Sequence, residues 1–369
     1  MRQAVVIFRA VAVLALLAVA ISCSSTQIPS ISASGARFKP LQDEKELWDR
    51  SRAEEQKLLN KAHLYEDPLL ESYLQGVVTR LTPQGMADNP AVHYRVRVIE
   101  DPTLNAFSFP HGSIYVHTGL LARVENEDQL ATVLGHEMTH VERRHMLRFE
   151  RSSQNKEVAF SVAATAASAV LDAAATVAES EGHRGAAVAI DVLGNVGVEL
   201  SLGFALVASV DGYGRDLEAE ADHGGFAKMA VAGYRLSESP KVYEALKEDY
   251  SEPKKVEAFF FGNHPRLSER IENSKRYAGL HTAAAARDRK PIDPDLFARR
   301  ILPVVRDDAR LNIELGRLKI AEAELERVRA RMPEDPLTQL YWDRLRLAQA
   351  AAAEARNEQE HSKKDGHRG

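Results

Sequence analysis

The chain has 369 residues, which is enough for a sizeable hydrophobic core and for two domains. Its net charge of −5 argues against a nucleic-acid partner, and its mean hydropathy of −0.31 argues against a polytopic membrane protein. The single cysteine, Cys23, excludes an intrachain disulfide.

Residues 1–22 have the pattern of a bacterial signal peptide. Two arginines precede an apolar run over residues 11–21, which is too short for a membrane span. Cys23 follows as in a bacterial lipobox, in which the signal is cut before the cysteine and the cysteine carries lipid. Ser24 in the next position favours the outer membrane, with the protein facing the periplasm. Secretion as a soluble periplasmic protein and an uncleaved anchor are the alternatives.

Residues 23–40 hold this cysteine and a stretch rich in Ser, Ala and Gly, which predicts a flexible tether. Residues 41–280 are then predicted to form one domain. Its first helices are expected over residues 41–62 and 68–81, the second with a proline in its first turn.

A small sheet is predicted next. Residues 94–99 alternate between apolar and polar side chains, and residues 105–118 have the pattern of a hairpin with a turn at Pro110-His111-Gly112. The edge of this sheet could hold an extended peptide through main-chain hydrogen bonds.

The segment H-E-x-x-H follows inside a helical pattern, with His136 and His140 as its two histidines. Residues four apart lie on the same face of a helix, so both imidazoles can point at one metal ion. Glu137 lies beside them, placed to take a proton from a metal-bound water. Asn126 is a good N-cap for this helix, with two acidic residues in the first turn and Gln129 at the capping-box position. These signals argue against a chance match on a surface helix.

A nearby histidine does not fit the same role. His145 is nine residues after His136, which places it about 180° around a continuous helix. We therefore expect a surface or packing histidine, directed away from the metal.

Two Ala- and Val-rich stretches, residues 158–171 and 186–210, come next. They predict buried or mutually packed helices that cover the site, and membrane insertion is the alternative.

An acidic helix is predicted to begin at Asp216 and to end near Gly233. Glu218 and Asp222 share one face of it, so Glu218 can be the third metal ligand and Asp222 can hydrogen-bond a ligand histidine. Glu220 lies about 200° around the helix from Glu218 and is not expected to ligate. Taken alone, this acidic run is typical of a solvated helix start.

The remaining chain contains a rigid corner and a helical tail. His264-Pro265 precedes another helical segment. Residues 281–294 are predicted to be a linker, residues 295–360 paired amphipathic helices, and residues 361–369 a disordered tail. The paired helices resemble one or two tetratricopeptide-type repeats, with a plain helical hairpin as the alternative.

These segments together resemble the HtpX- and BepA-type zinc metalloproteases, which are gluzincins related to the CAAX prenyl endoproteases. The matching pieces are Asn105-Ala106-Phe107, the hairpin at Gly112, residues 126–131, the H-E-x-x-H segment, Glu218 to Asp222, and His264-Pro265 with Arg270. The lipoprotein signal and the helical tail are similar to the periplasmic, BepA-like branch.

The resemblance implies an α+β, mainly helical, gluzincin-like fold with a small sheet beside the H-E-x-x-H helix. It also implies one Zn²⁺ per chain, bound by His136, His140 and Glu218, with Glu137 as the general base. The strand at Asn105 and Ala106 is expected to line the peptide cleft. His264 is expected near the metal or the oxyanion, and Arg270 is expected to brace the site.

The main hypothesis is a zinc metalloendopeptidase that acts on misfolded envelope proteins in quality control. The alternative is a chaperone or docking module at the outer membrane, with gated or secondary proteolysis. In that alternative the C-terminal helices bind an outer-membrane assembly complex, and the lipid on Cys23 anchors the protein to the membrane. A lesser hypothesis is autoinhibition, with His264 in the open metal position.

Overall fold

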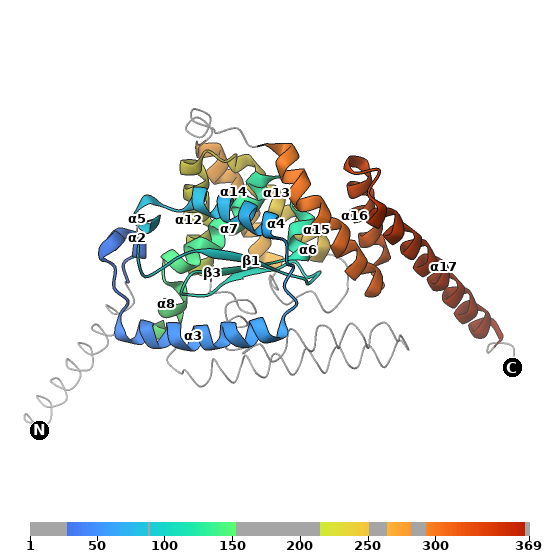
Figure 1. Cartoon of the computed structure of the whole chain (residues 1–369), viewed down its shortest axis with the longest axis horizontal. Coiled ribbons are helices and arrows are strands. Elements are labelled where there is room, and N and C mark those ends of the chain that lie inside the picture. Colours follow the sequence, from blue (N-terminus) through green and yellow to red (C-terminus); the bar gives the residue numbers. More distant parts are fainter. Residues whose placement is uncertain (1–27, 88, 153–214, 251–263, 282–292, 366–369) are drawn as a thin grey trace, which may run out of the picture.

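The computed structural model describes residues 28–87, 89–152, 215–250, 264–281 and 293–365. Within these residues the chain is mainly helical with one small sheet, as the sequence predicts (Figure 1). The predicted lipidation site Cys23 and the Ala- and Val-rich stretches 158–171 and 186–210 lie outside the described residues. No helix among the described residues has both the length and the apolar character needed to cross a membrane.

In the part of the chain that the structure describes, the sheet has three strands, β1 (Arg95–Ile99), β2 (Ala106–Ser108) and β3 (Ser113–His117), in the order β1-β3-β2. β3 is central, parallel to β1 and antiparallel to β2, so the predicted hairpin is present and β2 is an edge strand.

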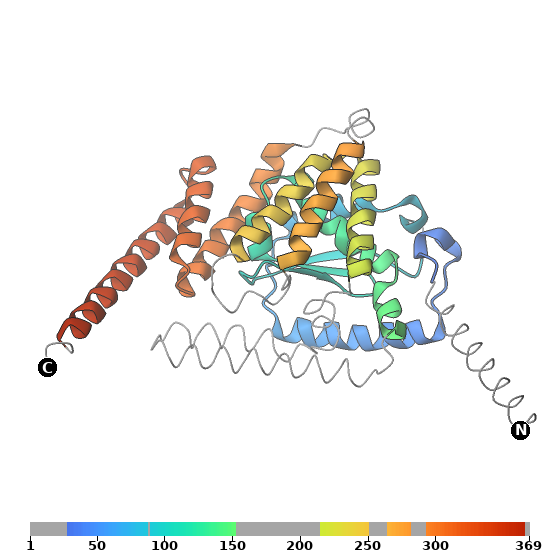
Figure 2. The ribbon, with the colours of Figure 1, turned by 180° about the vertical axis from the view of Figure 1, so that it is seen from behind.

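Helices lie on both faces of this sheet (Figures 1 and 2). α3 (Gln42–Lys61) runs along one face, where its Leu58 packs with apolar residues of the sheet. α4 (Pro68–Leu81), α6 (Thr118–Arg123) and α7 (Glu127–Glu142) pack on the other face with the main core. α3 and α4 match the predicted helices to within a residue at each end. α7 begins after its predicted cap but ends earlier than the continuous helix that was expected, and the short α6 was not predicted.

The remaining elements of the predicted protease domain surround α7. They are α2 (Ile31–Ser34), η1 (Gly35–Arg37), α5 (Gln84–Ala87), α8 (His145–Ser152), α12 (Arg215–Ala232), η2 (Leu236–Glu238), α13 (Ser239–Tyr250) and α14 (His264–His281). α12 packs most closely on α7, and α13 packs against α14.

The predicted tether is packed against the domain from residue 28 onward, and the prediction of flexibility there is wrong. Ile31 is fully buried and Phe38 is 5% exposed, and both belong to a small core with Trp48. Asn89 donates a side-chain hydrogen bond to the carbonyl of Gly35 at 3.0 Å. Isolated large apolar residues in a Ser- and Ala-rich stretch were sufficient to anchor it, because their burial removes apolar area from water.

The C-terminal helices are α15 (Pro294–Glu314), α16 (Leu318–Arg331) and α17 (Pro336–Asp365). α15 differs from the prediction of a separate segment, because its Ile301, Val304 and Val305 are fully buried in the main core. α17 extends away from the body of the molecule (Figures 1 and 2) and stays helical to Asp365, where a disordered tail was expected from residue 361.

Candidate metal centre

α7 begins at its predicted cap. Asn126 Oδ1 accepts a hydrogen bond from the backbone N–H of Gln129 at 3.0 Å. The Gln129 side chain reaches back to the N–H of Glu125, one residue before the cap, at 2.9 Å. In the first turn Asp128 is 1% exposed and accepts hydrogen bonds from the backbone and the side chain of Arg235, both at 2.7 Å. The start of the helix is therefore fixed by buried polar contacts rather than by solvent.

Two glycines let α12 approach α7 backbone to backbone. A Cβ on Gly225 would lie 2.9 Å from the backbone nitrogen of His136, and one on Gly224 would lie 2.4 Å from Cγ2 of Thr139. The first distance is to backbone and leaves no room for a side chain at Gly225, and the second would force the Thr139 side chain to move. The close approach brings the acidic first turns of α12 to the histidine face of α7.

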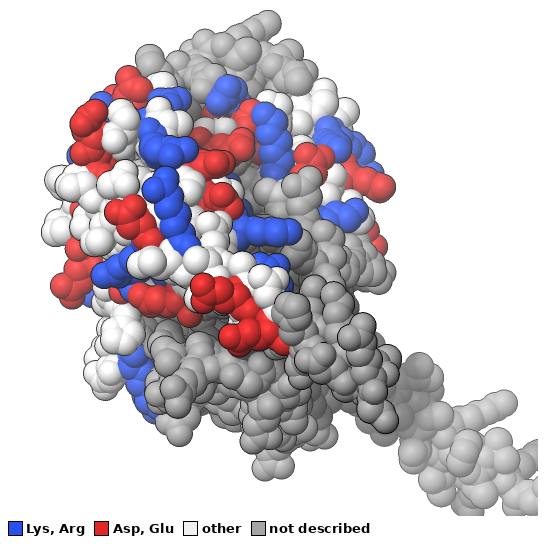
Figure 3. Space-filling model, turned by 90° about the vertical axis from the view of Figure 1, so that its right-hand side faces the viewer, with Lys and Arg blue, Asp and Glu red and all other residues white. Residues whose placement is uncertain are grey.

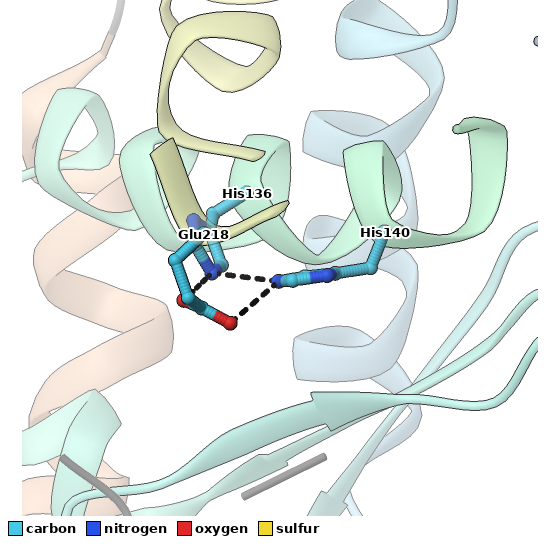
Figure 4. A group of neighbouring side chains, drawn as sticks. All are labelled: His136, His140 and Glu218. Atoms are coloured by element: carbon cyan, nitrogen blue, oxygen red, sulfur yellow. Dashed lines mark hydrogen bonds and ion pairs between the residues drawn. The ribbon is translucent and has the colours of Figure 1, made fainter. Parts of the chain in front are cut away.

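His136, His140 and Glu218 converge at this contact (Figure 4). The two Nε2 atoms lie 2.9 Å apart, and the Glu218 carboxylate oxygens lie 3.4 Å from His136 Nε2 and 3.7 Å from His140 Nε2. All three are able to offer a ligand atom within 4.8 Å of the others. The structure therefore brings the three predicted ligands together.

The donor set fits a divalent transition metal. Two imidazoles and one carboxylate, with a fourth position left over, are a ligand set of catalytic zinc sites. The Nδ1 atoms of His136 and His140 are both engaged with other side chains, at 2.8 Å and 2.9 Å. This arrangement leaves the two Nε2 atoms directed at a common point beside the Glu218 carboxylate.

Asp222 connects His136 to the rest of the site. Its Oδ1 lies 2.8 Å from His136 Nδ1 and accepts hydrogen bonds from Tyr243 Oη at 2.8 Å and from an Arg270 amino group at 2.7 Å. Arg270 also donates from Nε to Oδ2 at 2.9 Å and lies over the Tyr243 ring at 4.4 Å. Arg270 thus neutralises the buried Asp222 carboxylate and fixes its orientation toward the histidine.

Glu137 lies between the metal ligands and the sheet. Ser108 lies on the edge strand β2. Its hydroxyl donates to two oxygens of Glu137, the carboxylate Oε2 and the backbone carbonyl oxygen, each at 3.1 Å. The side chain that would move a proton is therefore tied to the strand that would hold a substrate.

Burial shifts the pKa values of these groups in the metal-free protein. It raises the pKa of Glu137 to about 7 and lowers the pKa of His140 to about 3. Burial opposes the ionised form of Glu218, but the histidines outweigh it and lower the pKa of that carboxyl well below its usual range. A neutral His140 and an ionised Glu218 are the forms that bind metal. Burial and Arg270 oppose the charged form of His136, but Asp222 and Glu218 outweigh them and raise its pKa to about 9, so a metal would displace a proton from this ring.

The prediction that His145 is directed away from the metal site is wrong. It is fully buried, its ring centroid lies 4.9 Å from that of His140, and the two Nδ1 atoms lie 2.9 Å apart. The prediction assumed one continuous helix, whereas α7 ends at Glu142 and α8 begins at His145 in a new direction.

Other predicted site residues lie less directly at the centre. Ala106 belongs to β2, but the side chain of Asn105 is 1% exposed and lies 3.3 Å from Nε2 of His117, so it is turned into the protein. Glu220 pairs with Arg148 rather than with the ligands, as expected from its place on the helix. His264 begins α14, and its side chain lies outside the described residues.

The sequence interpretation missed Ser108, Tyr243 and the Gly224-Gly225 pair. The glycine pair carried a signal, since two glycines inside a helix lower its stability and so indicate close packing. Ser108 and Tyr243 carried none, because a single hydroxyl is recognisable only once its neighbours are known.

The arrangement of two histidines and a glutamate on α7, completed by a carboxylate from a second helix, defines the metallopeptidase class. A search against family models supports the same conclusion. The model described as Peptidase family M48 matches residues 68–278, and the chain belongs to this family.

Curated relatives are similar over part of their length. The Beta-barrel assembly-enhancing protease of Escherichia coli is 34% identical over 97 residues, which cover 26% of this chain and 20% of that protein. A Vibrio cholerae protein that provisionally carries the same name is 27% identical over 221 residues, 60% of this chain and 42% of its own length. The Mitochondrial metalloendopeptidase OMA1 of Schizosaccharomyces pombe is 28% identical over 221 residues, 58% of this chain and 56% of its own. The matched part of the chain thus spans roughly half or less of each of these relatives.

Proposed function

We propose that this protein is a zinc metalloendopeptidase, with His136, His140 and Glu218 as the metal ligands and Glu137 as the general base. The observation that carries the proposal is the convergence of the three ligand side chains beside Glu137. When bound, Zn²⁺ would supply a water of lowered pKa and would polarise the scissile carbonyl.

The protein's own groups supply the remaining steps. β2 presents an edge on which an extended peptide can add as a further strand, and this edge lies beside Glu137. The Glu137 carboxylate takes a proton from the attacking water and delivers a proton to the leaving amine. Asp222 and Arg270 hold the ring of His136 in one orientation, with its Nδ1–H donated to the carboxylate.

The test compares the full-length protein with the Glu137→Gln variant. We expect one zinc per chain in both by elemental analysis, and casein cleavage only in the wild type. Cleavage at the wild-type rate by Glu137→Gln would overturn the mechanism, and absence of zinc from both would overturn the ligand assignment.

We further propose a cellular role in envelope protein quality control, with misfolded envelope proteins as substrates. Two lines of support are the names of the bacterial relatives and the lipobox-like segment at Cys23, which favours a lipid anchor at the outer membrane. Labelling with a radioactive fatty acid, compared between wild type and Cys23→Ser, tests the anchor; equal labelling of both would exclude it.

A second candidate role is docking through the C-terminal helices. Leu337, Leu340 and Leu347 share one face of α17 and are 40%, 43% and 73% exposed. Figure 3 shows acidic and basic side chains interspersed over the described surface on this side of the molecule. An apolar stripe with a mixed-charge surround suits a protein partner such as an outer-membrane assembly complex, as a tetratricopeptide-like segment would bind it.

The structure dictates how docking is tested. Deleting residues from 295 onward would remove α15 from the core. Changing the three exposed leucines to glutamine instead leaves the core intact. Loss of crosslinking to envelope proteins with unchanged casein cleavage would support docking, and unchanged crosslinking would exclude it.

A further inference from the structure

The chain changes direction immediately after the metal-binding helix. Arg144 has a φ of 59°, in the left-handed region that side chains other than glycine rarely adopt. Contacts between its guanidinium group and the N-terminal part of the chain offset the cost of this backbone conformation. Nε donates to Glu44 Oε1 at 2.8 Å, a second nitrogen donates to the carbonyl of Pro29 at 3.3 Å, and the group lies 5.3 Å from the centre of the Phe38 ring.

The turn decides where His145 lies. In an uninterrupted helix a residue five positions after His140 would point about 140° away from it. Instead the turn brings His145 beneath His140, with the two Nδ1 atoms 2.9 Å apart. Both rings are nearly or fully excluded from solvent, at 5% and 0% exposure.

The direction of this hydrogen bond follows from the other nitrogen of His140. Its Nε2 is directed at His136 and Glu218, where a metal would bind and where it must offer a lone pair. The hydrogen of the neutral ring is then on Nδ1. His140 Nδ1–H therefore donates, and His145 Nδ1 accepts.

With Nδ1 accepting, the ring hydrogen of His145 is on Nε2. That nitrogen lies 3.6 Å from the Oε2 atom of Glu220, which is within ion-pair range but too long for a direct hydrogen bond. Glu220 accepts a hydrogen bond from Arg148 at 2.6 Å, which fixes its carboxylate.

We propose that His145 is a positioning residue that holds the ligand ring of His140 in one tautomer and one orientation. The inference rests on the proposed metal site and deepens it. His145 thus serves His140 as Asp222 serves His136, but with an uncharged acceptor. A neutral second acceptor fixes the other ring without a further buried carboxylate and without the counter-charge that Asp222 receives from Arg270.

The test separates the acceptor from the volume of the side chain. His145→Asn keeps an acceptor oxygen near the place of Nδ1, whereas His145→Leu fills similar space without one. We expect His145→Leu to bind zinc roughly 10–100-fold more weakly in competition with a chromophoric chelator, as found for lost outer partners of ligand histidines. His145→Asn should stay within about threefold of the wild type. His111→Leu, at a largely buried histidine on the β2–β3 turn, is the matched control and should bind zinc as the wild type does.

Two outcomes overturn the proposal. One is wild-type zinc affinity and an unchanged visible spectrum of the cobalt form in His145→Leu. The other is an equal loss of affinity in His145→Leu and His145→Asn, which would show that packing rather than the acceptor is lost. If the wild type itself binds no zinc, the proposed function fails instead.

If His145→Leu does not fold, a measurement on the wild-type protein tests the same inference. In the zinc-loaded wild type labelled with ¹⁵N-histidine, long-range proton–nitrogen spectra report the tautomer of each ring. We expect His145 with its hydrogen on Nε2 and an unprotonated Nδ1. A hydrogen on His145 Nδ1 would overturn the inference whatever the variants show.

Discussion

The metal centre and the junction between α15 and α16 both bury carboxylates, but the pKa values of these carboxylates shift in opposite directions. At the metal centre, Asp222 is paired with Arg270, and the pKa of Asp222 is lowered despite its burial. Where α15 meets α16, Asp308 and Glu324 are 1% and 3% exposed and both accept hydrogen bonds from Asn312 at 3.0 Å. There burial raises the pKa of Asp308 to about 6 and that of Glu324 well above its usual range.

The difference shows that burial alone does not assign a role to an acidic residue. A buried carboxylate beside histidines and an arginine stays ionised and is ready for a cation. Two buried carboxylates close to each other hold a proton instead, because both cannot be charged at low cost. The first arrangement suits a metal ligand set, and the second suits a structural junction.

The largest expected effect is at the ligand itself. Glu218→Gln keeps the shape of the side chain and removes its charge, so zinc binding should weaken by more than the roughly 10–100-fold caused by loss of an outer partner. Casein cleavage should fall to background. Glu220→Gln, two residues along the same helix, is the control and should retain one zinc per chain by elemental analysis. Full zinc content in Glu218→Gln would remove this residue from the ligand set.

A smaller effect is expected at Asp222. Asp222→Asn should weaken zinc binding roughly 10–100-fold. It should also cost about 3–5 kcal/mol of stability, because Arg270 is left buried without its counter-charge.

A double variant, Asp222→Asn with Arg270→Met, removes both charges. Chemical denaturation should show that it recovers much of the stability while zinc affinity stays low. Equal stability of the single and double variants would contradict the pairing argument.

The contribution of the α15–α16 junction to stability should fall as pH rises, whereas that of an ordinary paired carboxylate falls as pH is lowered. The pKa of Asp308 is about 6 in the folded protein against an ordinary 3.8, so the folded state binds the extra proton between these values. The stability from this group is present below about pH 4 and is lost as pH rises through 6. Asp308→Asn should therefore flatten the fall in stability from pH 4 to 7, by up to about 3 kcal/mol.

Asp335 provides the control for this measurement. Its hydrogen bonds with Thr338 lower its pKa against the effect of burial, so its contribution is lost as pH falls. Asp335→Asn should leave the slope between pH 4 and 7 in place. A slope that is unchanged in Asp308→Asn would contradict the shared-proton interpretation.

The smallest expected effect is at Ser108. Ser108→Ala removes one hydrogen bond to Glu137, worth on the order of 1.4 kcal/mol, so kcat should fall roughly tenfold with KM nearly constant. Ser108→Thr keeps the hydroxyl and should restore much of the rate. A rise in KM with unchanged kcat would instead assign Ser108 to substrate binding.

Much of the site could be predicted because helical spacing is a local property. His136, Glu137 and His140 follow from one turn of helix, and Glu218 with Asp222 follows from another. Asn126 also marked the start of α7, because the cap hydrogen bond depends only on residues adjacent in sequence.

The predictions that were wrong depended on where a helix is interrupted and on contacts between residues far apart in sequence. The position of His145 could not be derived while Arg144 was taken as helical, and its φ of 59° is stabilised by Glu44, 100 residues earlier. The inclusion of α15 in the main core was missed for a similar reason, since its apolar face is as compatible with a separate helical pair as with the sheet domain.

The packed N-terminal arm would limit how far the domain can move from a membrane if Cys23 carries lipid, as proposed. The arm is fixed at the end of α7, where Ser32 donates to Glu142 and Arg144 donates to the carbonyl of Pro29. Only five residues lie between Cys23 and Pro29 in the sequence, so a fully extended chain would place the two residues about 20 Å apart at most. With lipid on Cys23, as proposed, this short connection would keep the protease close to the membrane. Its reach would be confined to proteins at or just above the bilayer surface, and substrates in the body of the periplasm would have to come to it.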